Sequence, residues 1–230
     1  MEKRTSNCLI VIGLAGMLFA FGDLLIPQEN VLFEATKRPD AFAELVTSSN
    51  YKWWGLRGFV GVLMEMIGTV GLYLYLQKSK AERLAFYGLL LTLTHHILGV
   101  GVFAVAFFMF PALAELHLNG DANALAFAAI EGPLGAYFAL SLAFTLIGLG
   151  VMAVAVYRSG HLPRWSGWLA FVGFLLIPVP GVVVQFAANF TWGMAYWWMA
   201  YHIRKNEQPV TQKEMRGADQ SMPALPEMVS

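Results

Sequence analysis

The stretch that decides the fold class is residues 53–77, which read WWGLRGFVGVLMEMIGTVGLYLYLQ. Arg57 and Glu65 are the only charged residues in it. A bilayer core about 30 Å thick is crossed by about 20 residues in an α-helix. Because the stretch is long enough and almost entirely apolar, it predicts a transmembrane helix.

Similar apolar stretches occur along most of the chain. The predicted spans are residues 8–26, 53–77, 84–113, 132–157, 165–180 and 182–203. Pro178, Pro180 and Gly181 divide the last apolar region, which favours a helical hairpin over one long helix. The sequence therefore predicts an all-α polytopic membrane protein, a six-transmembrane-helix bundle formed by residues 1–205. The polar residues 206–230 carry three prolines and predict a disordered tail.

The basic residues predict the orientation of this bundle. Eleven of the fifteen Lys and Arg residues lie before the first span, between spans two and three, between spans four and five, or after the last span. Cytoplasmic loops are the ones enriched in Lys and Arg. We therefore expect both termini in the cytoplasm (N-in/C-in) and a multi-pass protein of the cell inner membrane. Asp23 and Pro27 occupy positions where a signal peptide would have its cleavage site of small residues, which favours a retained first span.

Composition excludes several classes of protein. The chain is 57% hydrophobic and 13% charged, whereas soluble domains carry about 25% charged residues. Its formal net charge is zero, so nothing indicates a nucleic-acid partner, and the lipid bilayer is the expected surrounding. Cys8 is the only cysteine, which excludes an intramolecular disulfide and cysteine-based zinc or iron–sulfur sites.

Polar residues inside the predicted spans are the candidates for function, because ionisable groups at membrane depth are costly and usually serve a purpose. They gather in the outer half and the centre of the bundle. This distribution predicts a pocket that opens outward and binds a small molecule or a lipid. The candidate ligand-binding residues are Asp23, Arg57, Glu65, His95, His96, Glu131, Gln185 and Asn189.

Spans two and three are expected to face each other through stripes of small and polar residues. Arg57 and Glu65 are eight residues apart, so on a helix they point within about 80° of each other. The stripes are Gly58, Gly61 and Gly68 in span two, and Gly88, Thr92, His95 or His96, and Gly99 in span three. This arrangement predicts that Glu65 lies beside one of the two histidines, a pair able to exchange a proton. The alternative is a packing role, with Glu65 hydrogen-bonded in the bundle and Arg57 paired with Asp23 or Glu131.

The polar residues of the predicted spans are compatible with more than one cofactor and select none of them. His95 or His96 would serve as an axial ligand to haem b, but His117, His161 and His202 lie at other depths. A metal would find nitrogen and oxygen ligands at Glu65, His95 and Glu131, or at Glu65 with both histidines. No lysine lies in the middle of a predicted span, which excludes a retinal Schiff base.

Two segments resemble a known group of proteins. They are Tyr157-Arg-Ser-Gly-His-Leu-Pro-Arg-Trp-Ser-Gly-Trp-Leu169 and Leu72-Tyr-Leu-Tyr-Leu76. They are similar to segments of uncharacterised bacterial six-span membrane proteins with a domain of unknown function. The resemblance implies a prokaryotic inner membrane and brings no activity or site residues with it.

Three functions therefore stay open. The first is a transporter-like, sensory or accessory protein that binds a small molecule or lipid, with possible proton coupling. The second is a membrane-bound redox protein or enzyme that uses haem, metal or quinone near His95 and His96. The third is a structural subunit, in a homo-oligomer or with a membrane-complex partner.

Overall fold

The computed structural model of this protein describes residues 2–26, 29–129, 132–179 and 181–220. Within those ranges all regular elements are helices and no strand occurs, so the predicted all-α class is confirmed. In chain order they are α1 (Glu2–Asp23), η1 (Glu29–Phe33), α2 (Pro39–Thr47), α3 (Ser49–Leu76), α4 (Glu82–Ala104), η2 (Val105–Met109), α5 (Phe110–Leu118), η3 (Ala124–Ala128), α6 (Pro133–Ser159), α7 (Ser166–Leu176) and α8 (Val182–Gln220).

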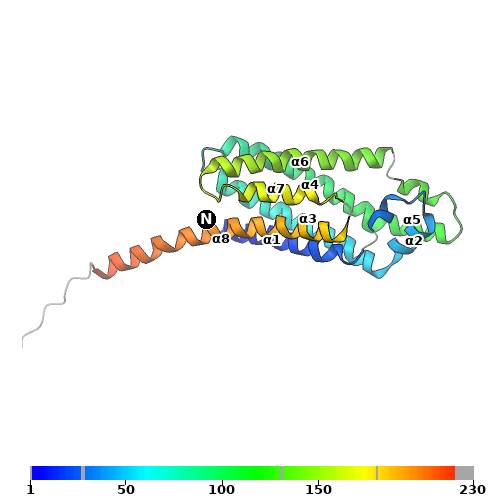
Figure 1. Ribbon diagram of the computed structural model, residues 1–230, viewed down its shortest axis with the longest axis horizontal. Helices are drawn as coiled ribbons and strands as arrows, with labels where there is room; N and C mark the ends of the chain where they lie inside the picture. Colours follow the sequence, from blue (N-terminus) through cyan, green and yellow to red (C-terminus); the bar gives the residue numbers. More distant parts are fainter. Residues whose placement is uncertain (1, 27–28, 130–131, 180, 221–230) are drawn as a thin grey trace, which may run out of the picture.

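Six of these helices form a closed ring, and Figure 1 shows it from the side, with the helices lying lengthwise along one another. Helix α1 packs against α3 and α8, α3 packs against α4, and α4 packs against α6. Helix α7 then joins α6 to α8 and completes the circle. A ring of this kind encloses an interior that every helix can reach, and this arrangement positions the candidate site.

A cap of short helices closes one end of the ring, at the right of Figure 1. It consists of η1, α2, α5 and η3, and it has an apolar core of its own that includes Phe42, Val46, Phe110 and Ala114. The buried hydroxyl of Tyr51, in the first turn of α3, donates a 2.8 Å hydrogen bond to the carbonyl of Ala106 in η2. Tyr51 and Ala106 also belong to the apolar core of the cap, so this core extends into the helices below it.

Four segments of the described chain are long and apolar enough to cross a membrane: Lys3–Asp23, Ser49–Leu76, Glu82–Leu118 and the stretch Ala124–Ser159, which includes α6. Helix α7 is apolar but has only 11 residues. Large apolar side chains are exposed on the outside of these helices, for example Leu63, Ile97 and Ile147. An apolar exterior of this extent is compatible with a membrane protein. The six-span count and the N-in/C-in orientation stay predictions.

Some helix boundaries differ from those predicted. The third predicted span, 84–113, lies in a longer helical run from Glu82 to Leu118 that contains one π-helical stretch, η2. Helix α7 ends at Leu176, before Pro178, and Gly181 adopts a positive φ of 122° where the chain turns into α8. Helix α8 continues through 206–220, where a disordered tail was predicted, and residues 221–230 lie outside the described part. That residues 206–230 as a whole form a disordered cytoplasmic tail stays a prediction.

Candidate functional site

A cavity of about 380 Å³ lies inside the ring, toward the cap. Each of the six ring helices contributes side chains to its wall, η1 and α5 contribute from the cap, and η2 contributes Ala106. Much of the wall is aromatic, from Phe19, Trp54, Phe103, Phe110, Phe138 and Phe174. The polar lining residues are Asp23, Tyr51, Arg57, Glu65, His95, Ser141, Thr145, Gln185 and Asn189.

One polar cluster joins α1, α3 and α8 at the cavity wall. Arg57 of α3 forms a buried ion pair with Asp23 at the end of α1. Asn189 of α8 donates a 2.8 Å hydrogen bond from Nδ2 to the second carboxylate oxygen of Asp23. Arg57 also donates to the carbonyl oxygen of Phe19, 3.2 Å away. The pairing of Arg57 with Asp23 that the sequence suggested is thus confirmed.

Aromatic rings enclose the guanidinium of Arg57. Its central carbon lies 5.3 Å from the ring centre of Phe19 and 5.3 Å from that of Trp54. Such cation–π contacts are worth about 0.5–2 kcal/mol, more where water is excluded. Because Asp23 neutralises the charge of Arg57, this side of the cavity wall consists of aromatic faces and an ion pair without net charge.

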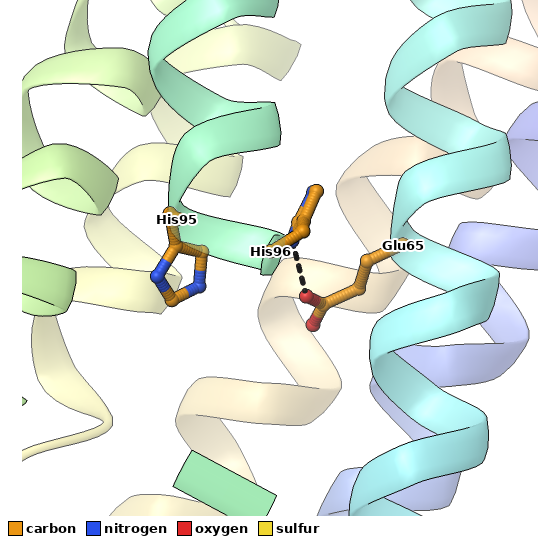
Figure 2. Close-up of side chains that lie close together, drawn as sticks. All are labelled: Glu65, His95 and His96. Carbon is orange, nitrogen blue, oxygen red and sulfur yellow. Dashed lines mark ion pairs between the residues drawn. The ribbon is translucent and has the colours of Figure 1, made fainter. Parts of the chain in front are cut away.

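A second polar cluster lies between α3 and α4. Nδ1 of His96 is 3.1 Å from Oε2 of Glu65, and both side chains are buried (Figure 2). On the other side of the same imidazole, Nε2 lies 3.1 Å from Oγ1 of Thr69. Thr69 is one helical turn from Glu65 on α3, so a single helix supports both edges of the His96 ring.

The neighbouring His95 turns toward α6. Its Nδ1 lies 3.0 Å from Oγ of Ser141 and 3.2 Å from the carbonyl oxygen of the same residue. Consecutive residues on a helix point about 100° apart, which lets His96 face α3 while His95 faces α6. One histidine pair therefore connects three helices around the interior.

Most of the residues predicted to form the pocket do meet there. Six of them line the cavity, namely Asp23, Arg57, Glu65, His95, Gln185 and Asn189. His96 contacts Glu65 from behind that wall. Glu131 lies outside the described residues. That these residues bind a ligand stays a prediction.

The predicted glycine stripe of span two is only partly correct. A Cβ on Gly58 would meet Phe103 of α4, but one on Gly61 or Gly68 would meet Phe19 or Ile12 of α1. Helix α3 lies between α1 and α4, so its small residues serve two neighbours instead of one. Likewise Gly88 of α4 approaches the backbone of Met152 in α6.

Several site residues were missed by sequence reasoning. Thr69, Ser141 and Thr145 are fully or almost fully buried near the two histidines. The one feature of the sequence that could have identified them is their position in the middle of predicted spans. That signal is weak, because Ser and Thr are common in membrane helices, where their hydroxyls bond to the preceding turn, as Thr145 does to the carbonyl of Ser141.

Within the part of the chain that the structure describes, Glu65, His95 and His96 form a group that could hold a metal ion, because one ligand atom from each lies within 4.8 Å of the others. The other three histidines make contacts elsewhere. His117 lies 3.0 Å from Asp40 of the cap, His161 accepts a hydrogen bond from Tyr75 through its carbonyl, and His202 lies 3.1 Å from Asn206. A haem with two histidine ligands therefore has no support from these contacts.

The chain matches a family of unknown function, DUF6796, over residues 1–201. It belongs to that family. The match confirms the resemblance to proteins with a domain of unknown function, and in this DUF6796 member it covers the helical ring up to residue 201, part-way along α8. A search of curated proteins found no match, and neither did a search of solved structures.

Proposed function

We propose that this protein is an integral membrane protein of a prokaryotic inner membrane that binds a small lipid-soluble molecule inside its helical ring. The proposal includes six spans with both termini in the cytoplasm. The observation that carries it is the cavity of about 380 Å³, which has aromatic walls and two polar clusters. Ligand pockets in proteins have volumes of about 300–1,000 Å³ and are mainly apolar, with a few polar groups that orient the ligand.

The wall indicates the chemistry of the ligand. Phe103, Phe138 and Phe174 offer flat apolar surface, which favours a compact apolar body. Gln185, half-buried at the wall, and Thr145 offer hydrogen-bonding groups. Because Arg57 and Asp23 neutralise each other, the best match is an uncharged molecule with a hydrogen-bonding head, such as a lipid or a quinone-like compound.

The short helix α7 supports entry from the side. Its 11 residues extend about 16 Å, roughly half of a bilayer core. The cavity continues past its end, where it is lined by Ile177, by Leu142 of α6 and by Gln185 of α8. A molecule dissolved in the bilayer would reach the cavity here without crossing water.

The test is to extract and identify the molecules that accompany the purified protein. The protein is prepared in detergent, its small molecules are extracted into organic solvent, and they are compared by mass spectrometry with an extract of the same membranes. The proposal expects one class of compound that is strongly enriched with the protein. A composition equal to that of the bulk membrane would contradict it.

A further inference from the structure

We propose that Glu65, His95 and His96 bind one divalent first-row transition-metal ion, such as Zn²⁺, at the inner wall of the cavity. This inference goes beyond the proposed function, because a metal site here does not require a lipid-soluble ligand. Four features of the described residues carry it.

The first feature is the spacing of the ligand atoms. Oε2 of Glu65 and Nδ1 of His96 lie 3.1 Å apart. Two ligands of a tetrahedral zinc ion, each about 2.0–2.1 Å from it, are separated by about 3.3 Å. The ligand atom of His95 lies within 4.8 Å of the other two, so a side-chain movement of roughly 1–1.5 Å would complete three-fold coordination.

The second feature is a small void beside these residues. Its volume is about 10 Å³, and its lining includes Glu65, His95, His96, Thr69 and Thr145. A space of this size is at the lower limit for one water molecule. The void, whose wall also includes apolar residues such as Leu149 and Phe174, therefore offers room for a single small ion beside the three candidate ligands.

The third feature is the state of His95. A carbonyl oxygen only accepts hydrogen bonds, so the contact between Nδ1 and the carbonyl of Ser141 places the ring proton on Nδ1. Nε2 then carries the lone pair. Figure 2 shows one ring nitrogen of His95 on the side of Glu65 and the other turned away. Metal-binding histidines usually donate their second nitrogen to a carbonyl or carboxylate in this way.

The fourth feature is the unsatisfied Nδ1 of His96. The atom is buried and makes no aligned hydrogen bond, although the Glu65 carboxylate lies 3.1 Å away. A buried polar atom without a hydrogen bond destabilises the folded protein, because it has lost its contact with water and gained none in exchange. An ion between Nδ1 and Oε2 would satisfy both atoms, while Thr69 holds the opposite nitrogen at 3.1 Å.

The ligand set selects the class of ion. Two imidazoles and one carboxylate suit zinc or iron, whereas magnesium and calcium prefer oxygen ligands throughout. Three protein ligands leave a fourth position for water or another molecule. Glu65 and His95 both line the large cavity, so that position would face it.

The test measures zinc retained by the full chain in detergent. The protein is stripped with a chelator, given an excess of Zn²⁺ alone, desalted and analysed for zinc by mass spectrometry. We expect about one zinc per chain, and at least about a 10-fold weaker affinity in Glu65→Gln, His95→Gln and His96→Gln. His202→Gln is the matched control, because His202 lies on α8 in contact with Asn206, and it should retain zinc like the wild type.

Two outcomes would overturn the proposal. One is a wild-type protein that retains no more zinc than His96→Gln. The other is an equal loss in His202→Gln, which would indicate adventitious binding to surface histidines. If the site variants do not fold, the proposal is tested on the wild type alone, which is loaded with Co²⁺ and examined by visible absorption spectroscopy. A visible spectrum of four- or five-coordinate cobalt supports the site, and the spectrum of the hexaaqua ion contradicts it.

Thr69 supplies a further control as a positioning residue. Thr69→Ser keeps the hydroxyl beside Nε2 of His96, and Thr69→Val removes it. Loss of such a supporting hydrogen bond typically lowers metal affinity by about 10–100-fold. Zinc affinity should fall in Thr69→Val and stay near the wild-type value in Thr69→Ser; an equal affinity in the two variants would contradict the assigned role.

Discussion

Glu65 of α3 and His96 of α4 meet inside the helical ring, with Oε2 and Nδ1 3.1 Å apart and both side chains buried. The contact joins two helices that are adjacent in the chain and in the ring. It also places an acid and a base in the interior of the ring, away from its outer surface. The site described above depends on this placement.

Removal of one partner of the Asp23–Arg57 pair should destabilise the fold. Asp23→Ala leaves Arg57 buried without its carboxylate partner, since both side chains are less than a tenth exposed. Breaking a buried pair costs about 3–5 kcal/mol. The measurement is thermal unfolding in detergent, with Arg38→Ala as control, because the exposed Arg38–Glu34 pair should contribute at most about 1 kcal/mol.

The double variant Asp23→Leu, Arg57→Met removes both charges at once. Comparing its stability with that of Asp23→Ala shows how much of the loss comes from leaving Arg57 buried without a partner. Replacement of both partners by apolar residues is often neutral. We therefore expect the double variant to be more stable than Asp23→Ala. Equal instability of the two would show that the pair contributes to stability in its own right.

Close contact between α1 and α8 should make Gly16 intolerant of larger residues. A Cβ on Gly16 would lie 2.6 Å from the Cα of Gly193, a backbone atom that cannot move aside. Gly16→Val should lower stability by about 1–3 kcal/mol or more through overpacking. Gly150→Val is the matched control, since its nearest neighbour would be Phe171 at an ordinary 3.6 Å. Unchanged unfolding of Gly16→Val would contradict the packing.

The proposed orientation predicts which loops are accessible from outside the cell. In a Cys8→Ser background, Asn119→Cys lies after α5, on the proposed outer side, and Lys80→Cys lies between α3 and α4. A membrane-impermeant maleimide should label Asn119→Cys in intact cells. Lys80→Cys should react only after the membrane is permeabilised, and the reverse pattern would invert the topology.

Long apolar stretches made the helical class predictable, and the rule that polar residues avoid lipid brought Asp23, Glu65 and Asn189 to one interior. The division of the α3 glycines between α1 and α4 was not predictable, because small residues at helical spacing do not specify their neighbour. The same holds for Ser141, whose contact with His95 exists only because α6 follows α4 around the ring.

Gly99 gives access to the cavity without disturbing the helix packing. It lines the cavity, and an added Cβ would lie 3.7 Å from Val62. Gly99→Ala should therefore fold normally and gain about 0.5–1 kcal/mol from the lower entropy of the unfolded chain. A loss of stability in thermal unfolding would show that the space is already filled by the protein.

The most direct test of ligand binding is native mass spectrometry of Gly99→Phe beside the wild type and Gly150→Phe. The Gly150→Phe control places the same side chain on α6 near Phe171 of α7, and Gly150 does not line the cavity. The proposed function predicts that a bound small molecule accompanies the wild type and Gly150→Phe and is lost from Gly99→Phe. The same bound mass at equal occupancy on all three folded proteins, or none on the wild type, would contradict it.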